Sequence, residues 1–352
     1  MFEQGVIRPP SEASSLLVRV TRNCPWNRCL FCPAYKGTSF SRRSVDEIKN
    51  DIDEMARYHG ENASRITSAF LQDADSLILP THELLEVIRH IKDRFPGVTR
   101  LTSYARAKSL KKKSVDSLVS LREAGLTRIH TGLESGSLQV LKLIKKGEKP
   151  EDMIEGGKRV MAAGISLSEY IMPGVGGTAL SQENALETAR VLNHIRPDFI
   201  RVRTFALPPN SPFQTMVDEA RFQPLTDSGI VSEIRLLLAN LDEMPAHFRC
   251  GDFSLNLLMH VDGYLDKDKK RLLAELDAFL ALSEEDQKAY SLLQRSGYYN
   301  VHPSAMIQNE DMMTQLRQKV KDLETEHAES FDQYIRALMS CQLPQPQTDH
   351  WQ

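Results

Sequence analysis

The stretch Asn23-Cys24-Pro25-Trp26-Asn27-Arg28-Cys29-Leu30-Phe31-Cys32 decides how the rest of the chain is interpreted. It gathers three of the five cysteines in the spacing C-x4-C-x2-C, whereas Cys250 and Cys341 stand alone. A random scatter of five cysteines would produce this spacing roughly 0.0006 times per chain. Chance is therefore a poor explanation, and the stretch is a candidate site.

Three kinds of thiol site could explain this spacing. A disulfide framework favours an even number of cysteines in a small secreted domain. A structural zinc ion needs four ligands, and the nearest downstream histidine is the lone His59. Three thiolates without a fourth suit a four-iron four-sulfur cluster that keeps one iron open to another ligand, because soft sulfur ligands favour iron–sulfur chemistry.

Composition sets broad limits on the class of protein. The 352 residues include 44 Lys and Arg against 47 Asp and Glu, a net charge of −3, so nothing indicates a nucleic-acid partner. No apolar run approaches the ~18 residues of a membrane span, and Met1 to Pro10 lacks the layout of a signal peptide. We therefore expect a cytoplasmic protein without a membrane partner, in which thiols stay reduced.

Strand and helix patterns alternate after residue 15. Strands are expected to begin near residues 16, 66, 100, 128, 166 and 198, and Ser44-Val45-Asp46-Glu47 predicts a capping box at the start of the first helix. Strict alternation implies a parallel sheet with right-handed crossovers, and the strand spacing is close to the ~31 residues per unit of a (βα)8 barrel. The predicted fold is α/β: a partial (βα)6 TIM-like barrel.

A proline-rich segment at residues 208–212 separates the alternating strands and helices from a part of the sequence with helical patterns only. Beyond it we expect helices over residues 227–241, 254–260, 266–282, 283–294 and 311–339. The predicted division is a barrel core over residues 1–215 and an α-helical C-terminal extension over residues 216–352.

Cys24, Cys29 and Cys32, placed ahead of a six-unit alternation, resemble the radical S-adenosylmethionine (SAM) superfamily over about residues 14–215. The likeness is to its elongator-subunit, methylthiotransferase and coproporphyrinogen-dehydrogenase type of core, whose usual C-x3-C-x2-C spacing is one residue shorter. The resemblance implies that the three thiolates hold a [4Fe-4S] cluster and that SAM chelates the open iron. It also implies reductive cleavage of SAM to a 5′-deoxyadenosyl radical, with an external electron donor such as flavodoxin or ferredoxin.

The resemblance places SAM-binding residues in the loops and turns that follow the strands. Acidic side chains there accept hydrogen bonds from an ammonium group or a ribose, an Arg fork holds a carboxylate, and glycines let the backbone approach adenine. The cofactor-binding candidates are Phe31, Gln72, Asp73, Asp75, Arg106, Glu134, Gly174, Gly176 and Arg203.

Structural alternatives stand beside several of these assignments. Phe31 also suits a loop anchor, and the segment around Asp73 and Asp75 suits a helix-entry turn. His130 is more typical of interior packing than of a site, and Cys250 of a small buried hydrophobe.

The short stretch before the first strand leaves no room for a cobalamin domain, so we expect a single-cluster enzyme. It would be an oxidoreductase or a transferase acting on a small molecule, and no catalytic residue can be named. The alternative is a non-enzymatic iron–sulfur or zinc protein that serves as a sensor or scaffold.

Overall fold

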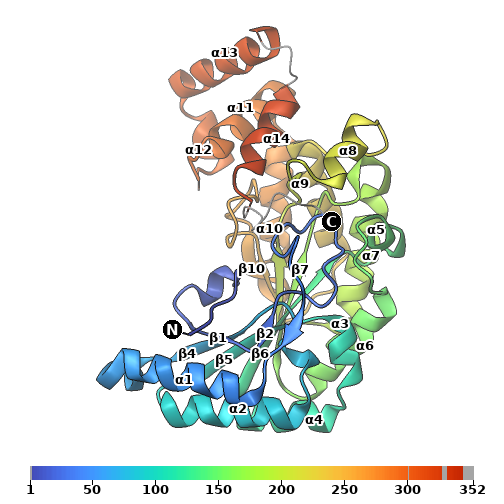
Figure 1. Cartoon of the computed structure of the whole chain (residues 1–352). Helices are drawn as coiled ribbons and strands as arrows, with labels where there is room; N and C mark the ends of the chain where they lie inside the picture. The colour runs from blue at the N-terminus through green and yellow to red at the C-terminus, as the bar shows by residue number, and fades with distance from the viewer. Residues whose placement is uncertain (1, 300, 327–330, 344–352) are drawn as a thin grey trace.

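The computed structural model describes residues 2–299, 301–326 and 331–343, and its centre is one curved eight-stranded sheet (Figure 1). The strands follow the order β1-β4-β5-β6-β7-β8-β9-β10; neighbours from β1 to β9 are parallel and β10 is antiparallel to β9. Their bounds are β1 (Leu16–Arg19), β4 (Ser68–Gln72), β5 (Arg100–Ala105), β6 (Leu126–Glu134), β7 (Ser166–Ile171), β8 (Phe199–Val202), β9 (His247–Arg249) and β10 (Asp262–Tyr264). A separate ribbon, β2 (Thr21–Arg22) and β3 (Ser41–Arg42), flanks the cysteine loop.

Helices connect the parallel strands and lie along the outside of the sheet in Figure 1. They are α1 (Val45–His59), α2 (Thr81–Arg94), α3 (Ala107–Lys112), α4 (Val115–Ala124), α5 (Leu138–Leu143), α6 (Pro150–Ala162) and α7 (Gly177–Ile195). The predicted capping box is confirmed: Glu47 N–H donates to Ser44 Oγ at 3.2 Å, and Ser44 N–H donates to Glu47 Oε2 at 2.8 Å. The predicted partial barrel is confirmed, because β1, β4, β5, β6, β7 and β8 fall where the alternation places them.

The C-terminal region is mostly helical. Its helices are α8 (Pro212–Asp218), α9 (Asp227–Asn240), α10 (Leu265–Leu280), α11 (Glu284–Arg295), α12 (Pro303–Ile307), α13 (Glu310–Glu326) and α14 (Phe331–Ser340). The single helix expected over residues 311–339 is therefore α13 and α14, and residues 327–330 between them lie outside the described residues.

The helix expected over residues 254–260 was a wrong prediction, because these residues form turns between β9 and β10. Asn256 explains the irregular backbone. Its side chain accepts hydrogen bonds from Thr204 N–H and Oγ1 and donates to the carbonyl oxygens of Val202 and Cys250. Three of these bonds tie the turn to the end of β8, and the fourth ties it to the residue after β9, a parallel strand beside β8. The sheet therefore continues past residue 215, and a division into two units stays a prediction.

The amino ends of the strands are closed by a buried polar cluster. Glu12, in the short helix η1 (Pro10–Glu12), accepts hydrogen bonds from Ser15 Oγ at 2.7 Å and Arg100 Nη1 at 2.8 Å. His130 is fully buried and makes edge contacts with the rings of Phe70 and Tyr104, which agrees with an interior packing role. This cluster closes the barrel end opposite the cysteine loop. None of the helices in the described part of the chain is long and apolar enough to cross a membrane.

Candidate functional site

A cavity of about 350 Å³ lies at the carboxyl ends of the parallel strands. This is the edge at which α/β folds place their active residues. One wall is the cysteine loop, another comes from the ends of β5 to β8, and a third comes from residues 253–255 of the C-terminal region. Residues 2–8, here called the N-terminal strap, add Ile7 and Arg8 to the lining.

The three clustered cysteines line this cavity together, and none forms a disulfide. Burial raises the pKa of Cys29 to about 12 and also raises the pKa of Cys32, so the bare loop favours neutral thiols. Within the described residues, no group of three or more His, Cys, Asp or Glu side chains is arranged to hold a metal ion. A four-iron cluster spreads its cysteine ligands further apart than one ion does, and three soft donors facing one cavity fit it chemically.

Asp73, which directly follows β4, fixes the cysteine loop through its buried carboxylate. Its fully buried carboxylate pairs with Arg19 Nη2 at 2.8 Å and accepts Asn23 N–H at 3.0 Å and Tyr35 Oη–H at 3.1 Å. Asn27, at a φ of 45°, donates from its side chain to the carbonyl oxygen of Tyr35 at 2.5 Å. The loop is thus fixed by its own polar residues on both sides of Cys24.

The neighbouring Gln72 fixes the N-terminal strap. Its side chain accepts the Gly5 N–H at 2.9 Å and donates to the Ile7 carbonyl oxygen at 2.9 Å. Because Arg8 follows Ile7 directly, these two hydrogen bonds also place Arg8 at the cavity.

A chain of opposite charges forms the wall beside the cysteines. Lys146 Nζ lies 3.2 Å from Glu134 Oε1 and 4.0 Å from Glu148 Oε2, and Arg106 Nη2 lies 3.5 Å from Glu148 Oε1. Burial disfavours the charged ammonium, but Glu134 and Glu148 together hold the pKa of Lys146 above its usual value. The Arg106 guanidinium also lies 5.5 Å from the centroid of the Trp26 ring. The Lys146 ammonium therefore stays charged, and these contacts fix the side chains of the wall in position.

The structure brings some of the predicted site residues to the cavity and leaves others outside its lining. Those at the cavity are Cys24, Phe31, Cys29, Cys32, Arg106, Glu134 and Arg203. Those outside the lining are Gln72, Asp73, Asp75, Gly174 and Gly176.

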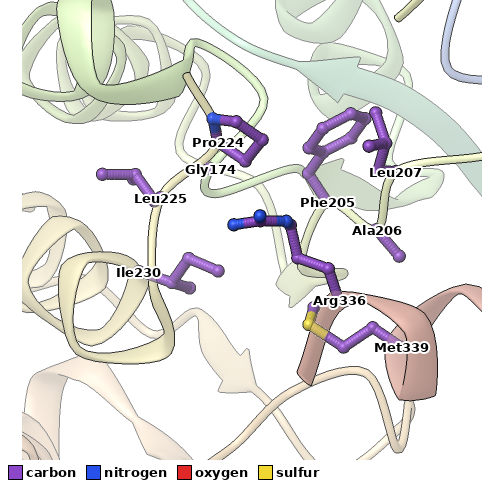
Figure 2. A pocket seen from close by; sticks show the side chains of 9 residues that line it. All are labelled: Gly174, Phe205, Ala206, Leu207, Pro224, Leu225, Ile230, Arg336 and Met339. Carbon is purple, nitrogen blue, oxygen red and sulfur yellow. The ribbon is translucent and has the colours of Figure 1, made fainter. Parts of the chain in front are cut away.

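Asp75 and the two glycines serve other parts of the fold. Asp75 is buried, which raises its pKa to about 6, and it accepts hydrogen bonds from Ser109 Oγ at 2.6 Å and Arg106 N–H at 3.2 Å. Gly174 lines a separate small pocket beside Ile230 and Arg336 (Figure 2). Gly176 directly precedes α7.

Several lining residues were missed by the motif analysis: Ile7, Arg8, Trp26, Tyr104, Lys146, Tyr170 and Phe253. Trp26 sits inside the cysteine stretch and Tyr104 directly precedes the end of β5, so their positions in the sequence could have suggested them. Lys146 follows α5 in a loop without a motif. The strap residues and Phe253 arrive through long-range contacts that no local pattern reports.

Comparison with known proteins gives a family for the cysteine-bearing part. Residues 18–189 match the model of the Radical SAM superfamily. The chain is 29% identical over 167 residues to the 4'-phospho-dehydrooxetanocin synthase of Priestia megaterium, covering 44% of this chain and 22% of that protein. It is 23% identical over 123 residues to the tRNA uridine(34) acetyltransferase of Methanocaldococcus infernus, covering 35% of this chain and 22% of that protein. The chain thus spans less than a quarter of each curated relative.

A solved structure agrees on the fold. The cobalamin-dependent S-adenosylmethionine radical enzyme OxsB, with aqua-cobalamin and SAM bound, matches with a TM-score of 0.50 and 17% identity, covering 94% of this chain and 53% of that one. At this identity the likeness concerns the fold alone. Together with the family match, it means that residues 18–189 of this chain form a Radical SAM domain, the domain of a superfamily of enzymes that use a [4Fe-4S] cluster and SAM.

Proposed function

We propose that this chain binds a [4Fe-4S] cluster through Cys24, Cys29 and Cys32 and cleaves SAM reductively, so that a 5′-deoxyadenosyl radical acts on a small molecule in the same cavity. The observation that carries the proposal is the position of the three thiols on one wall of a cavity whose other walls are polar and aromatic. When bound, the cluster would supply the electron for cleavage of a carbon–sulfur bond, and the protein would supply binding, orientation and exclusion of water.

The chain's own residues suit the two ends of SAM. Glu134 carries an oxygen that can accept hydrogen bonds from ribose hydroxyls or from the methionine ammonium group. Arg106, held by Glu148 and lying 5.5 Å from the centroid of the Trp26 ring, offers a fork for the methionine carboxylate. Phe31 lines the cavity between the last two cysteines and provides a flat apolar contact for adenine.

The other predicted SAM contacts receive different assignments in this proposal. Gln72 and Asp73 position the strap and the cysteine loop, because their polar atoms already bind those segments. Asp75 positions Arg106 through its backbone N–H. Gly174 and Gly176 shape the turn before α7, outside the lining.

The reaction class is an oxidoreductase or transferase reaction that begins with removal of a hydrogen atom. The relatives include a synthase and an acetyltransferase, and the chain matches only part of each. An external donor such as flavodoxin or ferredoxin would deliver the electron, and the cytoplasm, where thiols stay reduced, is the expected compartment. A non-enzymatic iron–sulfur or zinc protein is not favoured, because the matched superfamily consists of enzymes.

The test is anaerobic reconstitution of the full chain with iron and sulfide, followed by SAM and dithionite. The expected products are 5′-deoxyadenosine and methionine. The Cys29→Ala variant should retain no full cluster and form neither product.

A further inference from the structure

The charges on the cavity wall beside the cysteines already balance. Arg106 and Lys146 are the cations of that wall, and Glu134 and Glu148 are their carboxylate partners. Two positive side chains face two negative ones, so this wall carries no net charge, and the methionine end of SAM, whose ammonium and carboxylate also cancel, would leave it neutral.

Arg8 and Arg203 line the same cavity. In the described ranges, neither guanidinium forms an ion pair or a hydrogen bond with a carboxylate, and Arg203 lies 5.8 Å from the centroid of the Phe253 ring. Arg203 is half-buried, whereas Arg8 is exposed on the strap. The partly buried charge of Arg203 costs free energy unless a ligand supplies the opposite charge.

The two cofactors would not neutralise this pair. Three thiolates around an oxidised cluster leave a single negative charge, and SAM carries a single positive charge through its sulfonium. Lys36 stands near all three cysteines, with Nζ donating to the Asn27 carbonyl oxygen at 3.0 Å, and Arg203 stands near Cys32. Because the charges of the cluster and of SAM cancel each other, the charges of Arg8 and Arg203 remain.

The surface beside Arg203 is aromatic. The Tyr170 and Phe253 rings are 6.0 Å apart between centroids and meet edge to face, and Tyr104 lies further along the same lining. The Tyr170 hydroxyl is buried and has no hydrogen-bond partner in the described part of the chain. Such a surface accepts a flat, mainly apolar group that offers a polar atom to the hydroxyl.

We infer that the substrate is an organic anion, a phosphate monoester or a carboxylate on a flat body, whose charged group is held by Arg8 and Arg203 while its body lies against Tyr170 and Phe253. This rests on the proposed function, since it names the substrate class of that cavity. It assigns Arg203 to substrate rather than to SAM, because Arg106 belongs to the paired wall that suits the methionine end. Arg8 comes from the strap that Gln72 fixes, so substrate binding requires the strap in place.

The experiment uses the reconstituted full chain, kept anaerobic and saturated with SAM so that the methionine carboxylate is already bound. Phenyl phosphate, phenylacetate and benzyl alcohol are titrated by calorimetry into the wild type, Arg8→Ala, Arg8→Lys and Arg203→Ala. The matched control is Arg89→Ala, at an exposed position on α2 outside the cavity lining.

At least one of the two anions should bind at least tenfold more tightly than benzyl alcohol. Each alanine variant at the cavity should weaken that binding about tenfold or more, Arg8→Lys should weaken it less, and Arg89→Ala should change it less than about twofold. Preference for phenyl phosphate identifies a phosphate ligand, and preference for phenylacetate identifies a carboxylate ligand.

Equal binding of all three probes, no binding of either anion, or anion binding that survives in both alanine variants would overturn the inference. Loss of SAM binding rather than anion binding in Arg203→Ala would overturn the assignment of that side chain. SAM cleavage by the wild type is assayed in parallel. If the wild type cleaves SAM but binds no anion, the proposed function holds and the anion site is refuted. If it binds the anion but does not cleave SAM, the anion site holds and the proposed function is refuted.

Discussion

At the scale of single residues, Asp73 shows how a motif position and its contacts can point to different roles. Its place after a parallel strand favours a SAM contact, whereas its carboxylate is fully buried and engaged by Arg19, Asn23 and Tyr35. A carboxylate with those partners cannot also bind an ammonium group in the cavity without giving them up. We therefore propose that Asp73 is a positioning residue for the cysteine loop.

Asp73→Asn should destabilise the protein by about 3–5 kcal/mol, because it leaves the Arg19 charge without its buried partner. Denaturant unfolding of the apo-protein measures the loss, and iron per chain after reconstitution should fall with it. Asp116→Asn, on the exposed face of α4, is the control and should stay within about 0.5 kcal/mol of the wild type. Unchanged stability and iron content combined with weaker SAM binding would instead support a direct SAM contact.

Glu169 predicts a pH dependence of stability. Its side chain is buried on β7, where desolvation raises its pKa to about 8 from the usual 4.5 and Thr131 donates a hydrogen bond to it. Between those two pH values the folded protein holds a proton that the unfolded chain releases. The contribution of Glu169 to stability is therefore full below about pH 4.5 and is lost as the pH rises to about 8.

Glu169→Gln removes this titration and keeps the shape of the side chain. The variant should match the wild type at pH 5 and be more stable at pH 9 by roughly 1–4 kcal/mol. Chemical unfolding at pH 5, 7 and 9 measures the difference, with the exposed Glu123→Gln as a control whose difference from the wild type should not grow with pH. A constant difference between Glu169→Gln and the wild type would contradict the raised pKa.

At the scale of elements, the cysteine loop rests on the segment that follows α5. Trp26 Nε1 donates to the Lys145 carbonyl oxygen at 2.7 Å, and the Trp26 ring lies against Gly147. A Cβ at Gly147 would stand 2.2 Å from Trp26 Cζ2, so this residue must be glycine for the two segments to meet. The contact joins the loop that holds the cysteines to the loop that holds Lys146.

Gly147→Ala should displace Trp26 and lower the iron content after reconstitution. Gly297→Ala is the matched control, because Gly297 also has a positive φ but a Cβ there would have nothing within 4 Å. Both variants should lose about 1–2 kcal/mol from the backbone conformation, and only Gly147→Ala should lose more than that. Urea unfolding measures the loss of stability in each variant, and iron analysis measures how much cluster each variant holds. Equal losses of stability with full iron in both variants would refute the packing role of Gly147.

Elements with a local sequence signal could be predicted from sequence. Ser44 and Glu47 form the capping box, and the six parallel strands of the core follow the alternation, because both signals are local. The strands β9 and β10 each have only three residues, too few for a period-two pattern to register. Their pairing depends on Asn256 and on the open edge of β8, which lie far apart in the sequence.

At the scale of the whole molecule, the cavity is assembled from both ends of the chain. The strap supplies Arg8, the core supplies the cysteines, and the C-terminal region supplies residues 253–255 and Gln342, which accepts a hydrogen bond from Ser254 Oγ at 2.6 Å. The sequence could predict the core side of this site, since strand-end residues of a parallel sheet share one edge. It could not predict the other walls, because they are defined only once the chain is folded.

The most direct test of the proposed function is whether the reconstituted full chain cleaves SAM. With a verified four-iron cluster, SAM and dithionite, the wild type should form equal amounts of 5′-deoxyadenosine and methionine, and Cys29→Ala should form neither product. A wild-type protein that carries the full cluster, binds SAM and yields neither product would contradict the proposed function.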